Sequence, residues 1–258
     1  MIIDEQAEAA RVARRFWELA GATPAYPCDP EEALRQARPD SLELTCTGFP
    51  GLNVRKINIA MREQGIRLPP IDGPNRAMPG CLLADCGRGY IFYDASAAPP
   101  EQRFTKALLL ARFLEAYHLP RERALERLGE AIRPVLDGRR PPTLEEQAHA
   151  LMAGVRLNNL NQLVVRADEP PTSTEALGLQ RRIERIACEL LAPSALLRQR
   201  LRRFVPQVGG LSRLDWLTQL LCEEFGLPEA LAQSCARDWI PGQGELTLLD
   251  WIQANIKS

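Results

Sequence analysis

The stretch GCLLADCGRGYIFYDASAAPPEQRFTKALLLARFL, residues 80–114, decides the fold. Its first part holds two apolar runs on either side of a glycine-rich turn, which predicts a β-hairpin with strands at 80–86 and 90–94. Its second part predicts a strong helix over about 100–119, apolar in its second half. Strands followed by a helix in this way favour an α+β fold.

The rest of the chain is mostly helical by its pattern. Apolar periodicity predicts further helices at 4–20, 53–64 and 120–136. A short helix is expected after the cap Asp29, with Pro30 at its first position, and another from the capping box Thr143 to Glu146 until about Gly154. Two more are expected from the cap Thr174 to Leu191 and from Ser212 to Gly226. Strands are expected at 41–46 and 162–166, and the proline-rich segment 67–79 is expected to be a loop. Because helices outnumber strands and the strands cluster early, the fold class is α+β, mainly helical, with a small antiparallel sheet.

Composition restricts the class of protein. The chain has 258 residues, 45% of them apolar and 25% charged, as in an ordinary globular protein. The net charge of −1 gives no overall field that favours nucleic acid or an anionic membrane. No apolar run approaches the roughly 18 residues of a membrane helix, and the acidic N-terminus does not resemble a signal peptide. A cytoplasmic protein without a membrane partner is therefore expected.

The seven cysteines indicate neither disulfides nor a metal site. Their number is odd, their spacings are irregular and no Cys-x-x-Cys pair occurs. In a cytoplasmic protein such residues are expected to be small core residues or thiols.

Three motifs occur in order along the chain. They are RFTKALLLARFL at 103–114 after the strand-like YIFYD at 90–94, QRRIERIACELLAP at 180–193, and LCEEFGLP at 221–228. In their order, spacing and framing residues they resemble the ImmA/IrrE family of zinc metallopeptidases, typified by bacterial enzymes that cleave helix-turn-helix repressors. The resemblance covers roughly residues 40–240. It implies a zincin-like metallopeptidase fold, with an N-terminal helical segment at 1–40, the family-like domain at 41–203 and a C-terminal helical segment at 204–258 packed on it.

The residues that hold and use zinc in that family are absent. The resemblance places the first histidine ligand at Leu108, the catalytic glutamate at Leu109 and the second histidine at Arg112. It places the third ligand at Gln180. Leucine cannot coordinate a metal, arginine is a cation, and a glutamine amide is a poor zinc ligand. A degenerate member with no catalytic residues, no metal and no cofactor is therefore expected.

The two histidines of the chain do not offer replacement ligands. His118 follows Arg112 by six residues and so lies on a different face of the helix. Glu146 and His149 share a helix face but lack a third ligand, and a surface pair is expected there. Cys188 has no histidine near it in the sequence and is not expected to be catalytic.

The expected function is non-catalytic. A peptidase cleft without metal can still bind a peptide, so a regulatory or protein-interaction role is the first hypothesis, with a helix-turn-helix transcriptional regulator as a possible partner. Two alternatives stay open: an active zinc endopeptidase with displaced ligands that cleaves a repressor, and a DNA-associated accessory protein. The sequence basis for the last is an arginine stretch at 198–203, preceded by Arg181, Arg182 and Arg185. A solvated helix face is the simpler interpretation of those arginines, and nucleic acid is not the expected partner.

Two further expectations concern single side chains. Arg112 stands in an apolar helix where a zinc ligand would point into the cleft, and it needs a partner or access to water. Gln180 and Glu184 are one turn apart on the facing helix, so a polar tie from Arg112 to Gln180 or Glu184 is predicted. Trp216, Trp239 and Trp251 are expected to be core or interface residues rather than ligand stackers.

Overall fold

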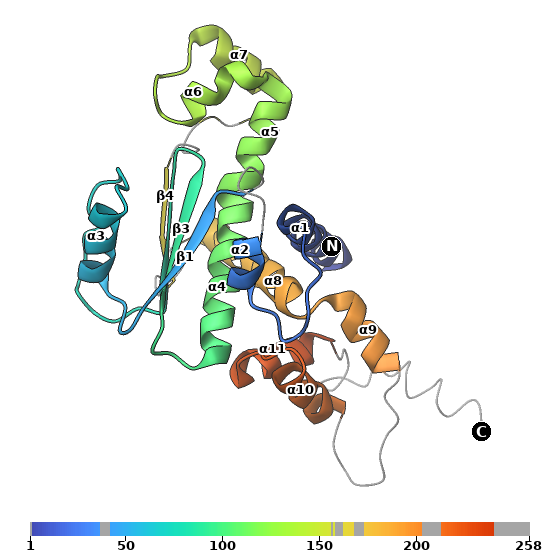
Figure 1. The fold of residues 1–258 in the computed structure, drawn as a ribbon. Coiled ribbons are helices and arrows are strands. Elements are labelled where there is room, and N and C mark those ends of the chain that lie inside the picture. Colours follow the sequence, from blue (N-terminus) through green and yellow to red (C-terminus); the bar gives the residue numbers. More distant parts are fainter. Residues whose placement is uncertain are drawn as a thin grey trace.

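The computed structural model of the protein describes residues 2–36, 42–155, 157, 162–167, 173–202 and 213–239. A four-stranded sheet carries helices on both faces, so the fold is α+β (Figure 1). Its elements are α1 (Ile2–Ala20), α2 (Pro30–Gln36), β1 (Leu44–Phe49), α3 (Val54–Glu63), β2 (Gly80–Asp85), β3 (Arg88–Asp94), α4 (Pro99–Phe113), the π-helical turn η1 (Leu114–His118), α5 (Leu119–Leu128), the 3-10 turn η2 (Glu130–Ile132), α6 (Arg133–Leu136), α7 (Leu144–Met152), β4 (Gln162–Arg166), α8 (Thr174–Leu191), α9 (Ser194–Arg202), α10 (Arg213–Glu223) and α11 (Glu229–Trp239).

The strands lie in the order β1-β3-β2-β4. All four predicted strands are present, but the expectation of a purely antiparallel sheet is wrong. The strand β2 is antiparallel to both β3 and β4, whereas β1 runs parallel to β3. The reason is that the hairpin inserts β3, rather than β2, next to β1, and a hairpin reverses the strand direction.

The predicted hairpin turn is confirmed. Cys86 and Gly87 form a two-residue loop in which both φ angles are positive, at 51° and 89°. That backbone matches the right-handed twist of the flanking strands. The hydroxyl of Tyr117, in η1, accepts a hydrogen bond from the Gly87 N–H at 2.8 Å and so ties the turn to the helix that follows.

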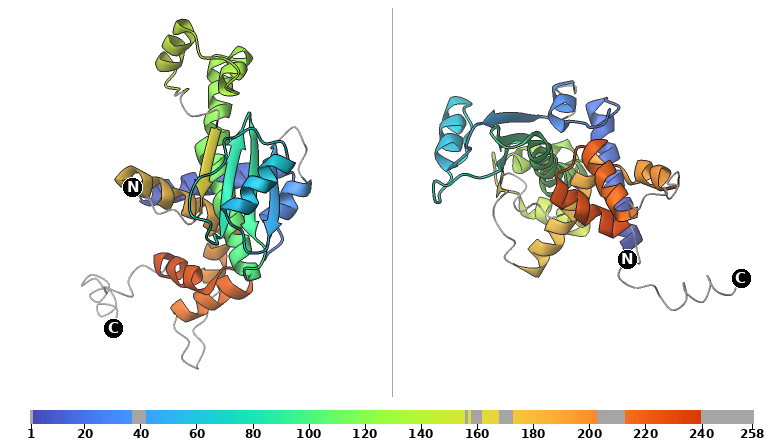
Figure 2. Two further views of the ribbon diagram at one scale, coloured as in Figure 1. Left: turned by 90° about the vertical axis from the view of Figure 1, so that its left-hand side faces the viewer. Right: turned by 90° about the horizontal axis from the view of Figure 1, so that it is seen from below.

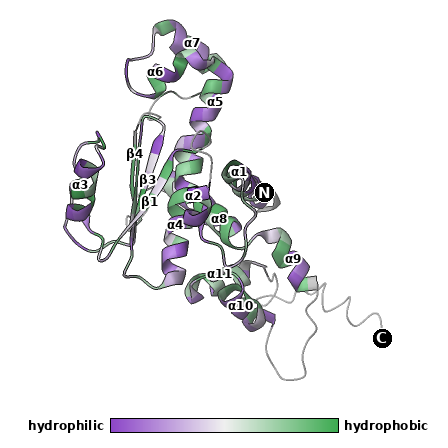
Figure 3. Cartoon of the chain, in the orientation of Figure 1, coloured by the Kyte–Doolittle hydropathy of each residue, from purple (hydrophilic) through white to green (hydrophobic). Residues whose placement is uncertain are grey.

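The two faces of the sheet bury different sets of residues. On one face, Leu82, Ala84 and Ile91 join the large core formed with the helices α1, α4 and α8. On the other face, Cys81, Leu83 and Phe92 pack under α3. This alternation follows from the two-residue period of a strand. The flanking helices carry both apolar and polar residues along their length, as expected when one side of each is buried (Figure 3).

The helices α4, η1 and α5 follow one another in a single long rod (Figure 1). Pro120, predicted to open a new helix, lies in the first turn of α5. Since proline cannot donate to the preceding turn, the wider π-helical turn η1 accommodates it. The predicted helix over 120–136 is wrong beyond Leu128, because Gly129 has a φ of 80° and ends α5. The short η2 and α6 follow.

The helix caps mostly agree with prediction. Asp29 accepts from the Glu31 N–H at 2.9 Å, and Thr143 and Glu146 form the reciprocal capping box of α7. For α8 the predicted cap is wrong by one residue, since Ser173 rather than Thr174 accepts from the Ala176 N–H. The predicted start at Ser212 lies outside the described residues.

The outlying helices project from this core. The helices α5 to α7 extend beyond one end of the sheet, and α10 and α11 lie side by side near the start of α4 (Figure 2). Within the described part of the chain, no helix combines the length and apolarity that crossing a membrane requires.

Candidate functional site

The helix α4 carries no metal ligands at the positions that the resemblance singles out. Leu108 is half-buried and packs against the main core, and Leu109 is only 1% exposed. Arg112 follows one turn after Leu108 on the same face. No group of three or more His, Cys, Asp or Glu side chains that could hold a metal ion occurs in the described ranges. These residues do not fit a catalytic zinc ion.

The predicted polar tie between Arg112 and Gln180 or Glu184 is wrong. Nη1 of Arg112 is buried without a hydrogen-bond partner, and no ion pair joins Arg112 to any described carboxylate. Burial lowers the pKa of Arg112, and no neighbouring carboxylate offsets that effect. The amide of Gln180 instead donates to Glu184 at 2.9 Å in an exposed pair.

The geometry of α8 explains this difference. The helix turns an apolar stripe toward α1 and α4, made of Ile183, Ile186, Ala187 and Leu190. Glu184 follows Ile183 by one residue and therefore lies about 100° further round the helix, and Gln180 lies one turn earlier on that side. A different ion pair connects the helices, between Arg182 of α8 and Glu115 of η1. In the sequence, the one feature that points to this ion pair is the spacing that puts Glu115 on the same helix face as Leu108 and Arg112.

The strand β4 forms one edge of the sheet, and some of its main-chain groups are paired with no other described strand. The Ala167 N–H donates to the Gly80 carbonyl at 2.9 Å, which makes this position a hydrogen-bonded pair of the β2–β4 ladder. Such pairs alternate along an antiparallel ladder. Residues 163 and 165 therefore bond inward to β2, whereas the N–H and C=O groups of residues 162, 164 and 166 point outward.

The side chain of Val164 is also open to solvent. It is 45% exposed, whereas Leu163 and Val165 pack against the main core. An apolar β-branched side chain beside outward main-chain groups is the arrangement that an added strand uses.

The helices α8, α9 and α11, with Gln6 of α1, enclose a cavity of about 580 Å³. Its wall contains three arginines against one acid, Glu184, together with an aromatic ring and two thiols; the other lining residues are Arg181, Arg185, Cys188, Arg198, Leu231, Ser234, Cys235 and Trp239. The sequence motif QRRIERIAC and the arginine stretch at 198–203 therefore contribute to one concave surface. The interpretation of these arginines as a plain solvated face is incomplete.

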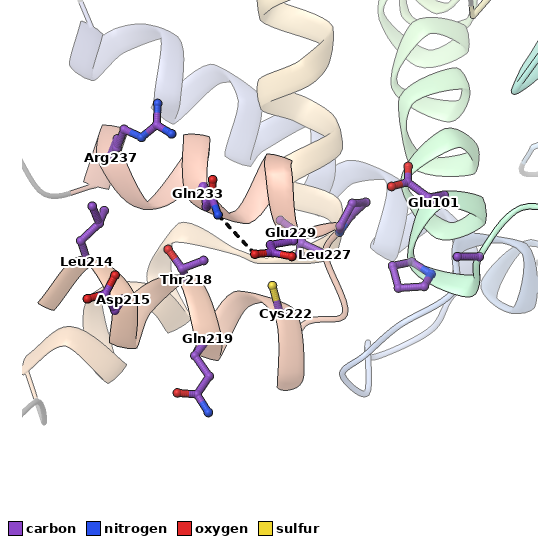
Figure 4. A pocket seen from close by; sticks show the side chains of 13 residues that line it. Glu101, Leu214, Asp215, Thr218, Gln219, Cys222, Leu227, Glu229, Gln233 and Arg237 are labelled. Atoms are coloured by element: carbon purple, nitrogen blue, oxygen red, sulfur yellow. Dashed lines mark hydrogen bonds between the residues drawn. The ribbon is translucent and has the colours of Figure 1, made fainter. Parts of the chain in front are cut away.

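A second cavity, of about 700 Å³, lies between the start of α4 and the helices α10 and α11 (Figure 4). Glu101 approaches it from α4, Asp215 and Thr218 from α10, and Glu229 from α11. Glu229 accepts a hydrogen bond from Gln233 at 3.4 Å. The wall of this cavity combines apolar residues with three carboxylates and one arginine, and the cavity lies away from the α4 positions that the resemblance assigns to a metal.

A buried lysine that the sequence did not single out stabilises the fold. Lys106 of α4 is 3% exposed and bonds to Asp29 at 2.5 Å and Glu31 at 3.0 Å. Burial alone would lower its pKa, but these two carboxylates outweigh burial and raise the pKa of Lys106. The hydroxyl of Tyr93 donates to Glu31 at 3.1 Å. Because every charge of this cluster has a partner, its role is structural: it joins α2 to α4 and β3 and is not a ligand site.

The remaining candidates from the sequence are the two histidines and the cysteines. Glu146 and His149 both lie at the surface, as expected, and Glu146 bonds to Arg140 at 2.5 Å and to the Thr143 N–H at 2.8 Å. His118 lies 3.5 Å from Glu122. The cysteines remain thiols.

In comparisons with known proteins, no family model, curated protein or solved structure matches this chain.

Proposed function

We propose that the protein is a non-catalytic module, resembling an inactivated zinc peptidase, that binds an extended segment of a partner protein along β4. The observation that carries this proposal is the row of outward main-chain groups at residues 162, 164 and 166, beside the exposed Val164. Addition of a strand to such an edge provides affinity through main-chain hydrogen bonds and specificity through alternate side chains.

The degenerate positions on α4 support binding rather than cleavage. Leu108 and Leu109 belong to the core, and the guanidinium of Arg112 would repel a metal cation at the adjacent position. A peptide held at the edge would therefore stay intact. Among partners, the resemblance favours a segment of a helix-turn-helix transcriptional regulator, which the protein would bind in the cytoplasm.

The test uses two variants of one residue on the edge strand. The Val164 N–H points away from β2, so Val164→Pro removes an edge donor without breaking the ladder to β2. Val164→Thr keeps both the N–H and the β-branched shape and serves as the matched control. Overlapping peptides from regulators encoded beside the gene are titrated against each protein, and every peptide is then weighed by mass spectrometry.

A peptide that binds the native chain and Val164→Thr, fails to bind Val164→Pro and stays uncleaved is the expected result. Binding should also slow hydrogen exchange at the amides of Val164 and Arg166. Equal binding by the proline variant would reject the edge as the site. Zinc-dependent cleavage of a bound peptide would favour the alternative of an active endopeptidase.

A further inference from the structure

We propose that the cavity between α1, α8, α9 and α11 is a binding site for a free nucleoside phosphate. This site is separate from β4 and does not depend on the function proposed above. Its volume of about 580 Å³ falls within the range of about 300–1,000 Å³ typical of small-molecule sites.

The charges of the wall favour an anion. The net charge of the whole chain is −1, yet Arg181, Arg185 and Arg198 gather at this one cavity. Arg185 forms an ion pair with Glu5. Within the described ranges, Arg181 and Arg198 form no ion pair with a carboxylate, and both are exposed. Two guanidinium groups that lack a protein anion at a concave surface are suited to phosphate oxygens, which they bind with paired N–H groups.

One of these arginines lies over an aromatic ring. The guanidinium carbon of Arg198 lies 5.5 Å from the centre of the Trp239 ring. A cation–π contact uses none of the N–H donors of the guanidinium in a hydrogen bond, so these donors stay available to a ligand. Nucleic-acid bases stack on the planes of arginine guanidinium groups and also on aromatic rings. The predicted role of Trp239 as a core or interface residue therefore gives way, in this proposal, to that of a stacking partner.

The rest of the wall suits the parts of a nucleotide between base and phosphate. Leu231 and the two thiols, Cys188 and Cys235, form an apolar side against which a ring packs. The Ser234 hydroxyl and the Glu184 carboxylate can bond sugar hydroxyls. Glu184 is the single acid among the lining residues, and it already accepts a hydrogen bond from the Gln180 amide. The three arginines outnumber it, so the charge of the wall is positive.

Calorimetric titration of the full chain with ATP and GTP tests the proposal, with adenosine and inorganic pyrophosphate as the two component probes. We expect one nucleotide per chain and much weaker binding of either component. Arg181→Gln and Arg198→Gln should each weaken nucleotide binding at least about tenfold, because each removes a charged hydrogen-bond donor. Trp239→Leu should weaken it as well.

The chain offers matched controls on the same two helices. Arg182 is paired with Glu115 and Arg200 with Glu224, and neither lines the cavity. Arg182→Gln and Arg200→Gln should therefore bind nucleotide like the native chain. Circular dichroism of each variant confirms that it is folded, and nucleotide should slow alkylation of Cys188 but not of Cys86.

Three results with the native chain would overturn the proposal. They are no heat with either nucleotide at millimolar concentration, pyrophosphate binding as tight as that of ATP, which would show a site for anions alone, and tighter, steeply salt-dependent binding of single-stranded DNA through the same arginines. Nucleotide binding unchanged in Arg181→Gln and Arg198→Gln would likewise place the ligand elsewhere.

Discussion

At the scale of single residues, the surroundings of Arg112 suit its side chain poorly. It stands in the apolar α4, its Nη1 is buried without a hydrogen-bond partner, and burial lowers its pKa. A desolvated donor without an acceptor costs more than an apolar group of the same shape. Lys106, six residues earlier on the same helix, shows the opposite solution, because two carboxylates neutralise it.

Replacement of Arg112 by methionine is therefore expected to stabilise the protein. Methionine keeps an unbranched apolar stem of similar reach and removes the unsatisfied donor. We expect the free energy of unfolding to rise by about 1 kcal/mol, measured by urea denaturation at neutral pH. Arg112→Lys, which keeps the cation, is the matched control and should show no gain. A clear loss of stability in the methionine variant would mean that the guanidinium has an acceptor that the structure does not show.

At the scale of elements, the sequence predicts those helices and turns whose signals lie within a few neighbouring residues. The hairpin follows from two apolar runs around a glycine-rich turn, and α7 from its capping box, because both signals lie within a few residues. The end of α5 at Gly129 was missed, since a helical periodicity that continues on both sides of one glycine does not reveal its φ. The missed partner of Glu115 is Arg182, which lies 67 positions away and becomes a neighbour only when α8 packs on α4.

The helices α8 and α11 bring together two thiols whose chemistry can be tested. The Sγ atoms of Cys188 and Cys235 lie 3.4 Å apart, and they must approach to about 2.05 Å to form a disulfide. The contact with Cys235, and then burial, raise the pKa of Cys188. Because the thiolate is the attacking species, a raised pKa slows thiol exchange near neutral pH.

A small aromatic disulfide reagent is expected to cross-link Cys188 to Cys235, faster as the pH rises. One protein thiolate displaces a reagent thiol and forms a mixed disulfide, and the second protein thiol then releases the other, so that two protein thiols are oxidised and one reagent disulfide is reduced. Peptide mass spectrometry should show a link between α8 and α11. Cys235→Ser should abolish the link, whereas Cys222→Ser should not affect it. A native chain that yields no such link even in alkaline buffer would show that the two helices do not bring these thiols together.

At the scale of the whole molecule, sequence patterns predict the individual helices and strands better than the contacts between them. The four strands and the α+β class follow from local patterns, but the parallel pairing of β1 with β3 depends on where the hairpin inserts. The arginine-lined cavity draws residues from four helices between positions 6 and 239. No spacing in the sequence links such positions, so their arrangement follows only from tertiary packing.

The whole architecture also makes the resemblance to a zinc peptidase testable by restoring its ligands. Leu108 and Arg112 are one turn apart on α4, and Glu115, on the same face, reaches Arg182 of α8. Gln180 flanks the stripe that α8 packs on α4. Two histidines on one helix and a carboxylate from a second form a catalytic three-ligand zinc set.

The resemblance predicts that the variant with Leu108→His, Arg112→His and Gln180→Glu binds about one zinc ion per chain, and that the native chain binds none. Bound zinc should raise its unfolding free energy by roughly 2.7 kcal/mol when free zinc is a hundredfold above the dissociation constant. The matched control keeps both histidines but moves the carboxylate by one residue, as Arg181→Glu, which turns it about 100° away. If both variants fold but bind zinc equally weakly, α4 and α8 do not hold the arrangement of the metallopeptidases, and the resemblance is confined to the sequence.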